Sequence, residues 1–380
     1  MKIGIDISQI VYGGTGVATY TKLLVSAFLR EAKEDQFVLF GSSWRNQRPM
    51  RDFFKSFGKE NVKKKFYLYP PKLLEFLWNG IHVFPIENLI GEVDVFHSSD
   101  WLEPPTRKAK KVTTVHDLAV YKYPETFSPR GGHDIVRNQK RKLFFTKRVC
   151  DKIIAVSETT KRDLMEILKI SEGKIKVIYE AADPSFSPRE KGEIGKIRDK
   201  YGIQGDYLLC VGTREPRKNL DRVIMAFAEI SRANENLSLV IVGKYGWGED
   251  LNSKLKNSLR DKQKSKIKLL GYVEKEALAC LFSGAKAFVY PSLYEGFGLP
   301  ILEAMACGCP VITSNLGSMK EISGEAALLV EPENIDSLAG AISQVLRSSD
   351  ELRLKGFKRA GEFNWERTAS QTLEVYRSLI

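Results

Sequence analysis

Short apolar runs alternate with longer amphipathic segments along most of the chain, and this alternation limits its fold more than any other feature. In the first half, five runs have the length and composition of buried strands: residues 2–7, 37–40, 93–97, 111–116 and 152–157. Residues 15–31 and 159–168 have helical periodicity, with Ser157 as a suitable N-cap for the second segment. Strands alternating with helices favour right-handed crossovers, so we expect a mainly parallel sheet covered on both faces.

The pattern lapses at about residues 184–205, where turn and charged residues accumulate, and then restarts. Six further strand-like runs follow, at 207–212, 237–243, 267–270, 287–291, 310–313 and 327–330, and then helical segments at 335–348 and 365–380. A chain of 380 residues exceeds the size of one growing core. We therefore predict an α/β protein of two Rossmann-like parallel-sheet domains, 1–183 and 184–364, facing each other across a cleft. The linker is expected at about 184–205, and helix 365–380 is expected to pack back on the first domain.

Several classes of protein do not fit this sequence. No run of about eighteen apolar residues could cross a bilayer as a helix, and the chain enters its first strand without the features of a secretory signal. The five cysteines lie mostly in apolar contexts and are interpreted as reduced core residues of a cytoplasmic protein. Cys307 and Cys309 lack the further ligands of a zinc site, so no metal is expected there.

Basic residues exceed acidic ones by 59 to 47, mainly in the first half, around residues 63–65, 108–111 and 137–148. We interpret that half as a basic surface. Two interpretations stay open: an ordinary solvated face, and peripheral contact with the anionic inner face of a membrane. Nucleic acid is not an expected partner, because no recognition module accompanies the charge.

A glycine-rich turn follows the first predicted strand and contains Gly14, Thr15 and Gly16. Glycines allow a ligand to approach the backbone amides closely. The spacing fails as an NAD fingerprint, because Thr19 occupies the third glycine position. A ligand-binding loop and a tight strand-to-helix turn both remain consistent with the sequence.

His116 ends the predicted strand 111–116, at the edge where parallel sheets bind their ligands. A histidine in this position can orient or deprotonate a sugar hydroxyl near neutral pH. The alternative is a capping or loop histidine.

Two adjacent cations, Arg217 and Lys218, follow the first strand of the second domain and precede a helix. Cations at a helix start oppose the helix dipole, so their position requires a partner anion. A diphosphate leaving group gains negative charge during bond cleavage, and fixed cations stabilise that charge. Solvated charges at a helix start are the alternative.

The most informative segment leads from a loop into a short helix and contains Glu295 and Glu303. Pro300 suits a first helical turn and Gly308 a helix end. The amides of residues 297–299 (Phe297, Gly298, Leu299) are then expected at a helix N-terminus, which is an anion site. Glu303 falls in about the first helical turn, where a carboxylate also stabilises the helix dipole without any ligand.

These segments together resemble the retaining glycosyltransferases of family 4, the group-1 family with the GT-B fold. The most specific element is Glu295 followed by Glu303, which is similar to the family's paired-glutamate motif within residues 291–313. One departure is Thr213, which stands where many members have arginine, and Arg217 is expected to supply that cation. With residues 115–118 and 123–127, the pattern looks like the subgroup that includes mannosyltransferases of bacterial surface polysaccharides.

The resemblance implies a role for each candidate residue in the second domain, the donor domain. Glu295 would bind hydroxyls of the transferred sugar, and Glu303 would hold the ribose. Arg217, Lys218 and the amides of 297–299 would hold the diphosphate. Tyr272 and Val273 would border the base, in a donor linked to GDP or UDP. No other cofactor and no metal is implied.

In the first domain, the acceptor domain, the resemblance places His116 beside the sugar and the Gly14–Gly16 loop against donor phosphate and acceptor. It implies a hexosyltransferase, with mannose as the guessed sugar, that acts on a glycan or lipid-linked acceptor in cell-surface polysaccharide synthesis. A sugar-nucleotide epimerase or hydrolase of the same fold is one alternative. A noncatalytic partner subunit is another, although such a subunit would be expected to have lost Glu295 or Arg217.

Overall fold

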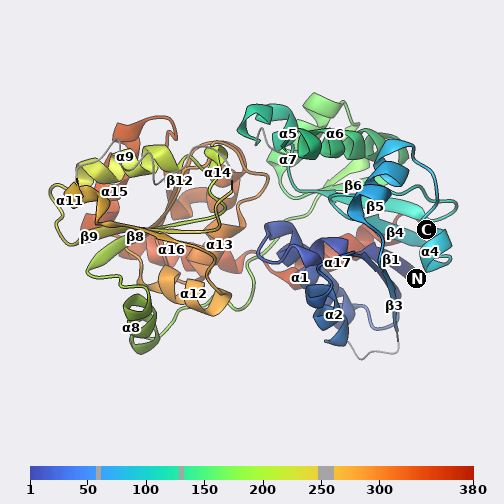
Figure 1. Cartoon of the computed structure of the whole chain (residues 1–380), viewed down its shortest axis with the longest axis horizontal. Helices are drawn as coiled ribbons and strands as arrows, with labels where there is room; N and C mark the ends of the chain where they lie inside the picture. Colours follow the sequence, from blue (N-terminus) through green and yellow to red (C-terminus); the bar gives the residue numbers. More distant parts are fainter. Residues whose placement is uncertain (57–60, 128–131, 247–260) are drawn as a thin grey trace. The chain divides into compact units, whose positions relative to one another are not determined.

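The computed structural model describes residues 1–56, 61–127, 132–246 and 261–380 and divides them into two compact units. Unit 1 comprises Met1–Lys122, Pro129–Glu180 and Asn364–Ile380, and unit 2 comprises Tyr123–Ser128 and Ala181–Phe363. Each unit is a parallel sheet with helices on both faces, as the alternation in the sequence predicts (Figure 1).

Within the described part of unit 1, a seven-stranded sheet has the order β3-β2-β1-β4-β5-β6-β7, and its neighbouring strands pair in parallel. The strands are β1 (Lys2–Asp6), β2 (Gln36–Ser42), β3 (Val62–Tyr67), β4 (Val95–Ser98), β5 (Lys110–Val115), β6 (Lys152–Ala155) and β7 (Ile175–Val177). The helices are η1 (Ser8–Val11), α1 (Gly16–Glu31), α2 (Arg48–Lys55), α3 (Pro71–Leu74), η2 (Glu75–Gly80), α4 (Glu87–Ile90), α5 (Ala119–Lys122), α6 (Gly132–Val149), α7 (Glu158–Leu168), η4 (Glu172–Lys174) and α17 (Trp365–Arg377). Figure 1 shows α1, α2 and α17 on one face of this sheet and α5, α6 and α7 on the other.

The last helix, α17, belongs to unit 1, although most of the chain between it and β7 forms unit 2. It packs against α1 and is N-capped by Asn364. Its buried Tyr376 forms a hydrogen bond with His97 at the end of β4. The C-terminal segment is therefore part of the unit 1 core, where it contacts α1 and the end of β4.

Within the described part of unit 2, a six-stranded parallel sheet has the order β10-β9-β8-β11-β12-β13. The strands are β8 (Asp206–Val211), β9 (Leu237–Val242), β10 (Ile267–Leu270), β11 (Ala287–Tyr290), β12 (Val311–Ser314) and β13 (Ala327–Val330). The helices are η3 (Pro124–Thr126), α8 (Lys191–Lys200), η5 (Pro216–Lys218), α9 (Leu220–Ile230), α11 (Asp261–Lys264), α12 (Lys275–Gly284), α13 (Leu299–Ala306), α14 (Gly317–Ser323), η6 (Gly324–Ala326), α15 (Ile335–Arg347) and α16 (Asp350–Gly361). An apolar core lies between this sheet and the packed pair α9 and α15.

Several local features differ from the sequence prediction, including the short edge strand β7, which no predicted run covered. The basic run 63–65 lies in the edge strand β3, which the apolar pattern missed because exposed lysines are a common feature of edge strands. The predicted linker 184–205 contains the helix α8, which has a Glu190–Glu193 capping box and packs against α12. Residues Tyr123–Ser128 belong to unit 2, where the Tyr123 ring packs against Tyr294.

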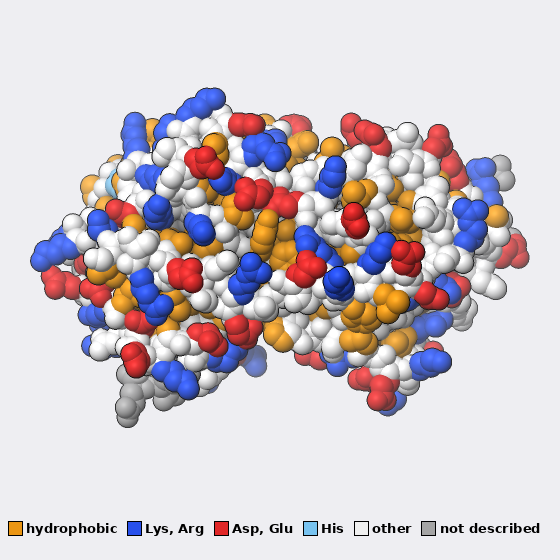
Figure 2. All heavy atoms as spheres, turned by 180° about the vertical axis from the view of Figure 1, so that it is seen from behind, with side chains coloured by type: hydrophobic (Ala, Val, Ile, Leu, Met, Phe, Trp, Pro, Cys, Tyr) orange, Lys and Arg blue, Asp and Glu red, His pale blue; other side chains and the backbone are white. Residues whose placement is uncertain are grey.

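The prediction of a basic surface is wrong for two of its cations. Lys63, Lys64, Lys65 and Lys108 are exposed, but Lys111 and Lys142 are buried in the core of unit 1. On the face drawn in Figure 2, apolar side chains reach the surface between groups of both charges, as is usual for a folded chain.

Candidate active site

The strand order explains which sequence motifs meet in each unit. In unit 2, β9 and β10 lie in sequence order on one side of β8, and β11 lies next to β8 on its other side. The strand order therefore reverses between β8 and β11. In unit 1 the corresponding reversal lies between β1 and β4. Ligands of open parallel sheets bind at the carboxyl ends of strands beside such a reversal.

The loops after β8 and β11 bring Arg217, Lys218 and Glu295 together, and we call these three residues the site cluster. Glu295 Oε2 lies 3.0 Å from Arg217 Nη1, and Glu295 Oε1 lies 2.6 Å from Lys218 Nζ. The sequence predicted a partner anion for Arg217 and Lys218. In this structure that anion is the Glu295 carboxylate. The cations lie in the 3-10 turn η5 rather than in the following helix α9.

Burial and charge together set the protonation of the site cluster. Burial alone would raise the pKa of Glu295, but Arg217 and Lys218 outweigh it and lower that pKa to about 2. Burial alone would lower the pKa of Lys218, but the Glu295 carboxylate raises it above its ordinary value. All three residues are therefore charged at neutral pH, and their side chains remain 11–13% exposed.

Sequence reasoning missed several residues that hold the site cluster in place. Glu215 pairs with Arg217 at 2.7 Å, and Tyr290 Oη accepts a hydrogen bond from Lys218 Nζ at 2.8 Å. The buried Asn219 donates hydrogen bonds to the carbonyl oxygens of Pro291 and Pro332. Glu215 and Asn219 lie beside Arg217 and Lys218 in the sequence, and Tyr290 precedes the Glu295 segment, so their positions were a usable signal, but their tertiary contacts were not.

The helix α13 begins directly after the Glu295 loop, as the sequence predicts. Gly298 is its N-cap residue, at φ 100°, a backbone conformation that favours glycine. A proline occupies the first turn, and no side chain caps this end. The first amides of a helix have no partners within it, so this end of α13 can bind an anion.

Glu303 is the fifth residue of α13, just beyond the first turn and close to the position that the sequence predicted. This position weakens the alternative that Glu303 serves only to stabilise the helix dipole from the first turn. Burial raises the pKa of the half-buried Glu303 to about 7, although Lys275 opposes the increase. The carboxyl group changes its charge close to neutral pH.

Tyr272 and Val273 follow β10, which is separated from β8 by β9. Val273 is buried, whereas Tyr272 is 47% exposed with Lys244 Nζ 5.1 Å from the centre of its ring. These two residues share the carboxyl edge of the sheet with the site cluster but lie two strands away from β8.

In unit 1, the glycine-rich turn shapes the start of α1. Gly14 has φ 85°, which glycine adopts readily. Thr15 is the N-cap: its Oγ1 accepts a hydrogen bond from the Ala18 amide and donates one to the Tyr12 carbonyl. This hydroxyl has a structural role, which favours the strand-to-helix turn as the explanation for Thr15 itself.

His116 follows β5 at the carboxyl edge of the unit 1 sheet, where the sequence placed it. Its Nδ1 lies 2.8 Å from Oε1 of the buried Glu180, and the Tyr20 ring meets its ring edge-on at 4.7 Å. Burial alone would lower the pKa of His116, but the hydrogen bond and charge of Glu180 raise it above the ordinary value, with smaller contributions from Asp100 and Asp117. Sequence reasoning missed Glu180, whose only signal was its position just beyond the last strand of the sheet.

A small recess beside His116 is lined by residues of α1 and by residues at the carboxyl ends of β1, β4 and β5, including Asp6, Ser99 and Asp100. Asp6 is buried, and its Oδ2 has no hydrogen-bond partner among the described residues. Burial raises the pKa of Asp6. The carboxyl edge of unit 1 therefore combines a histidine with carboxylates, a set of groups that can bind hydroxyls.

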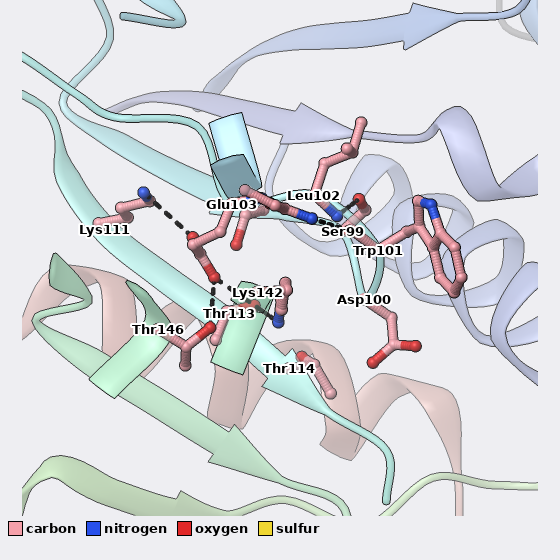
Figure 3. A network of polar contacts seen from close by, with 12 residues as sticks. Ser99, Asp100, Trp101, Leu102, Glu103, Lys111, Thr113, Thr114, Lys142 and Thr146 are labelled. Atoms are coloured by element: carbon pink, nitrogen blue, oxygen red, sulfur yellow. Dashed lines mark hydrogen bonds and ion pairs between the residues drawn. The ribbon is translucent and has the colours of Figure 1, made fainter. Parts of the chain in front are cut away.

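A second ionic group, which we call the buried cluster, consists of Glu103, Lys111 and Lys142 in unit 1. Figure 3 shows both lysines and Thr146 pointing toward the Glu103 carboxylate, with Asp100 pointing away from it. Glu103 lies 3.1 Å from Lys111 Nζ and 3.6 Å from Lys142 Nζ, and Thr146 Oγ1 donates to it at 2.6 Å. Burial would raise the pKa of Glu103, but the two ammonium groups lower it.

Three further findings concern the described residues alone. They contain no group of three or more His, Cys, Asp or Glu side chains arranged to hold a metal ion. The five cysteines are free thiols and all are buried, in agreement with the interpretation as reduced core residues. Among the described helices, none combines the length and the apolar character that crossing a membrane would require.

Comparison with protein families matches both halves of the chain. The family "Glycosyl transferases group 1" matches residues 193–361, and "Glycosyltransferase Family 4" matches residues 14–186. The O-antigen chain mannosyltransferase B of Escherichia coli is 30% identical over 391 residues and is covered, like this chain, over 100% of its length. The chain belongs to the family 4, group-1 glycosyltransferases. Both the predicted family and the predicted enzyme class are confirmed, and the epimerase and noncatalytic alternatives lose support.

More distant relatives agree with this assignment. The MMP alpha-(1->4)-mannosyltransferase of Mycolicibacterium hassiacum is 28% identical over 316 residues, which cover 76% of this chain and 72% of that protein. The sucrose-phosphate synthase of Thermosynechococcus elongatus has a similar structure, with a TM-score of 0.73 at 21% identity over 100% and 99% of the two chains. Anabaena HepE in complex with UDP gives 0.71 at 18% identity over 99% of each chain. The glycosyltransferase has the GT-B type of fold, with two parallel-sheet α/β domains.

Proposed function

We propose that this glycosyltransferase transfers mannose from GDP-mannose to a glycan or lipid-linked acceptor during synthesis of a cell-surface polysaccharide. The observation that carries the proposal is the site cluster, in which Arg217, Lys218 and Glu295 meet at the strand reversal of unit 2. The choice of mannose rests on relatives that are named as mannosyltransferases. The activity needs no metal ion, because two fixed cations can stabilise the departing diphosphate.

In this proposal the donor exchanges partners with the site cluster. The diphosphate takes over the interaction that Glu295 makes with Arg217 and Lys218, while the amides at the start of α13 bind its remaining oxygens. The Glu295 carboxylate then accepts hydrogen bonds from hydroxyls of the sugar. Glu215 and the Tyr294 carbonyl keep the Arg217 guanidinium in place during this exchange.

Glu303 binds the ribose hydroxyls, and Tyr272 with Val273 borders the base. In unit 1, His116 binds the reacting sugar through Nε2, because Nδ1 is held by Glu180. The Gly14–Gly16 turn approaches the ligand through its backbone. The enzyme acts at the inner face of the membrane, and transfer proceeds with retention, which agrees with the α linkage in the name of one relative.

Incubation with GDP-mannose and a mannose-terminated oligosaccharide tests this proposal. We expect acceptor-dependent release of GDP and an α-mannoside by NMR, with the same rate after chelation of divalent ions. UDP-glucose in place of GDP-mannose should give no product. A β-mannoside, or release of GDP that is independent of acceptor, would contradict the proposal.

A further inference from the structure

The segment that contains α3, η2 and the turn after them exposes an unusual series of large apolar side chains. Phe76 is 57% exposed, Ile81 52%, Val83 45% and Phe84 40%. Leu73 on α3 and Phe144 on the adjacent helix α6 are also exposed. Single exposed apolar residues are ordinary, but several on elements that pack together indicate an interaction site. We call these six residues the apolar patch.

The turn at 81–84 adopts a conformation that such residues usually avoid. His82 has φ 53° and Phe84 has φ 69°, both in the left-handed region that favours glycine. Hydrogen bonds hold the turn in this form, from the Val83 amide to the Leu77 carbonyl and from Trp78 Nε1 to the Phe84 carbonyl. Strained backbone that its surroundings maintain is typical of functional segments. The side chains of Ile81, Val83 and Phe84 on this turn are exposed.

The helix α6 adds a row of cations beside the patch. Arg137, Arg141, Phe144 and Arg148 are all exposed and follow the i, i+4, i+7, i+11 spacing of one helix face. The Arg148 guanidinium lies 3.7 Å from the centre of the Phe144 ring. Helix α6 packs against η2, and the His82 ring stacks on Phe145 at 4.0 Å, which joins the cationic face to the apolar patch.

Most acidic side chains near the patch are already engaged. Glu75 accepts a hydrogen bond from Trp101, and Glu87 accepts one from the Arg107 amide. Asp134 pairs with Arg137 at 2.7 Å. Among the described residues of α3, η2, the turn 81–84 and α6, the remaining exposed charged side chains are cations, namely Lys72, Arg141, Lys147 and Arg148.

We propose that the apolar patch and the basic face of α6 dock the enzyme on an anionic lipid bilayer. Phenylalanine and isoleucine side chains enter the boundary between headgroups and acyl chains, while neighbouring arginines and lysines meet anionic headgroups. Apolar side chains beside a row of cations match the layered chemistry of an anionic bilayer, which places charged headgroups next to acyl chains. This inference deepens the proposed action on a lipid-linked acceptor, but binding to vesicles requires neither donor nor acceptor.

Vesicle sedimentation of the full chain tests the proposal at low salt. Recovery should be strong with vesicles of phosphatidylcholine plus phosphatidylglycerol and weak with phosphatidylcholine alone. Arg141→Glu with Arg148→Glu should lower the affinity at least about 25-fold, at roughly fivefold for each charge lost or reversed. Ile81→Ser with Val83→Ser should lower it at least about tenfold.

Matched variants in unit 2 serve as controls. Met225→Ser with Leu354→Ser removes apolar groups that are at least as exposed, and Arg232→Glu with Arg347→Glu makes the same change in charge. Both should bind vesicles like the parent. Transfer to a short water-soluble acceptor should be unchanged in all four variants, so a wrong donor assignment and a wrong docking surface give different results. Two results would overturn the proposal. The first is that the parent chain binds neither kind of vesicle, as expected for a surface that binds a protein instead. The second is that the parent and the unit 1 variants bind vesicles equally.

Discussion

The two ionic clusters of this enzyme each place two cations around one central glutamate, but they differ in their surroundings. The buried cluster is sealed, with side chains of Glu103, Lys111 and Lys142 at most 1% exposed. The site cluster keeps 11–13% of each side chain exposed and lies between loops at the carboxyl ends of adjacent strands. A ligand can reach only the second cluster without unfolding a core.

An anionic ligand would be expected to bind the cluster with the more positive net charge, but the net charges of the two clusters run the other way. Lys111 and Lys142 face one carboxylate, whereas Glu215 joins Glu295 to balance Arg217 and Lys218. The more positive cluster is therefore the buried one. Position at a strand reversal and access to solvent, rather than excess charge, favour the site cluster as the binding site for an anionic ligand.

The largest expected effect comes from removing a cation of the site cluster. Arg217→Ala should reduce kcat/KM at least about 100- to 1,000-fold, because a fixed charge at the leaving group is lost. The unfolding midpoint should change little. Steady-state kinetics with GDP-mannose measure the effect, and Arg232→Ala, at an exposed position in the same unit, is the matched control. Normal turnover of Arg217→Ala would remove this residue from the site.

The buried cluster should respond in the opposite way. Glu103→Gln leaves two buried ammonium groups without their carboxylate, so the free energy of unfolding should fall by about 3–5 kcal/mol. Activity per folded molecule should not change. Denaturant unfolding and kinetics on the same preparation separate the two quantities.

A triple replacement sharpens this prediction. Glu103→Leu with Lys111→Met and Lys142→Met exchanges the buried ions for apolar groups of similar size. It should recover most of the stability that Glu103→Gln loses. A large loss of turnover in the triple variant would show that the buried cluster takes part in catalysis.

A smaller effect is expected from Glu303, whose pKa lies at about 7. If the ionised carboxylate accepts hydrogen bonds from ribose, GDP affinity should increase by up to about tenfold from pH 6 to pH 8, as the ionised fraction grows. Calorimetric titration measures this, and Glu303→Gln should remove this increase, leaving only the part that comes from ionisation of the terminal phosphate of GDP at about pH 6. Folding raises the pKa of Glu303, so the folded state favours the neutral carboxyl group. The contribution of Glu303 to the free energy of unfolding therefore falls as pH rises from about 4.5 toward about 7. For this reason GDP affinities, rather than unfolding midpoints, should be compared between pH values.

The smallest effect concerns the protonation of His116. Glu180→Gln should lower the pKa of His116, because the carboxylate that stabilises the imidazolium is removed. The chain has four histidines, so ring proton NMR can follow each of them, and the signal lost in His116→Asn assigns the resonance. His97 should remain neutral, since burial and Lys142 lower its pKa to about 3. An unshifted His116 titration in Glu180→Gln would contradict the pairing.

The sequence predicted most of the fold, because strand and helix periodicities are local. It missed β3, whose exposed lysines hide an edge strand, and α8, whose capping box lies in a charged segment. It also predicted the residues of the site cluster, since strand-end motifs converge in a parallel sheet. It could not foresee that Lys111 and Lys142 share a buried carboxylate with Glu103, or that Glu180 reaches His116, because these contacts join segments far apart in the chain.

The most direct test of the central claim is thermal unfolding with GDP and with guanosine. A ligand at about 100 times its Kd adds about 2.7 kcal/mol to the stability of the form that binds it. We predict that GDP, but not guanosine, raises the midpoint of the parent chain and of the triple variant without the buried cluster, and that Arg217→Ala loses this increase. An equal GDP-induced increase in Arg217→Ala and the parent would contradict the assignment of the site cluster as the diphosphate site.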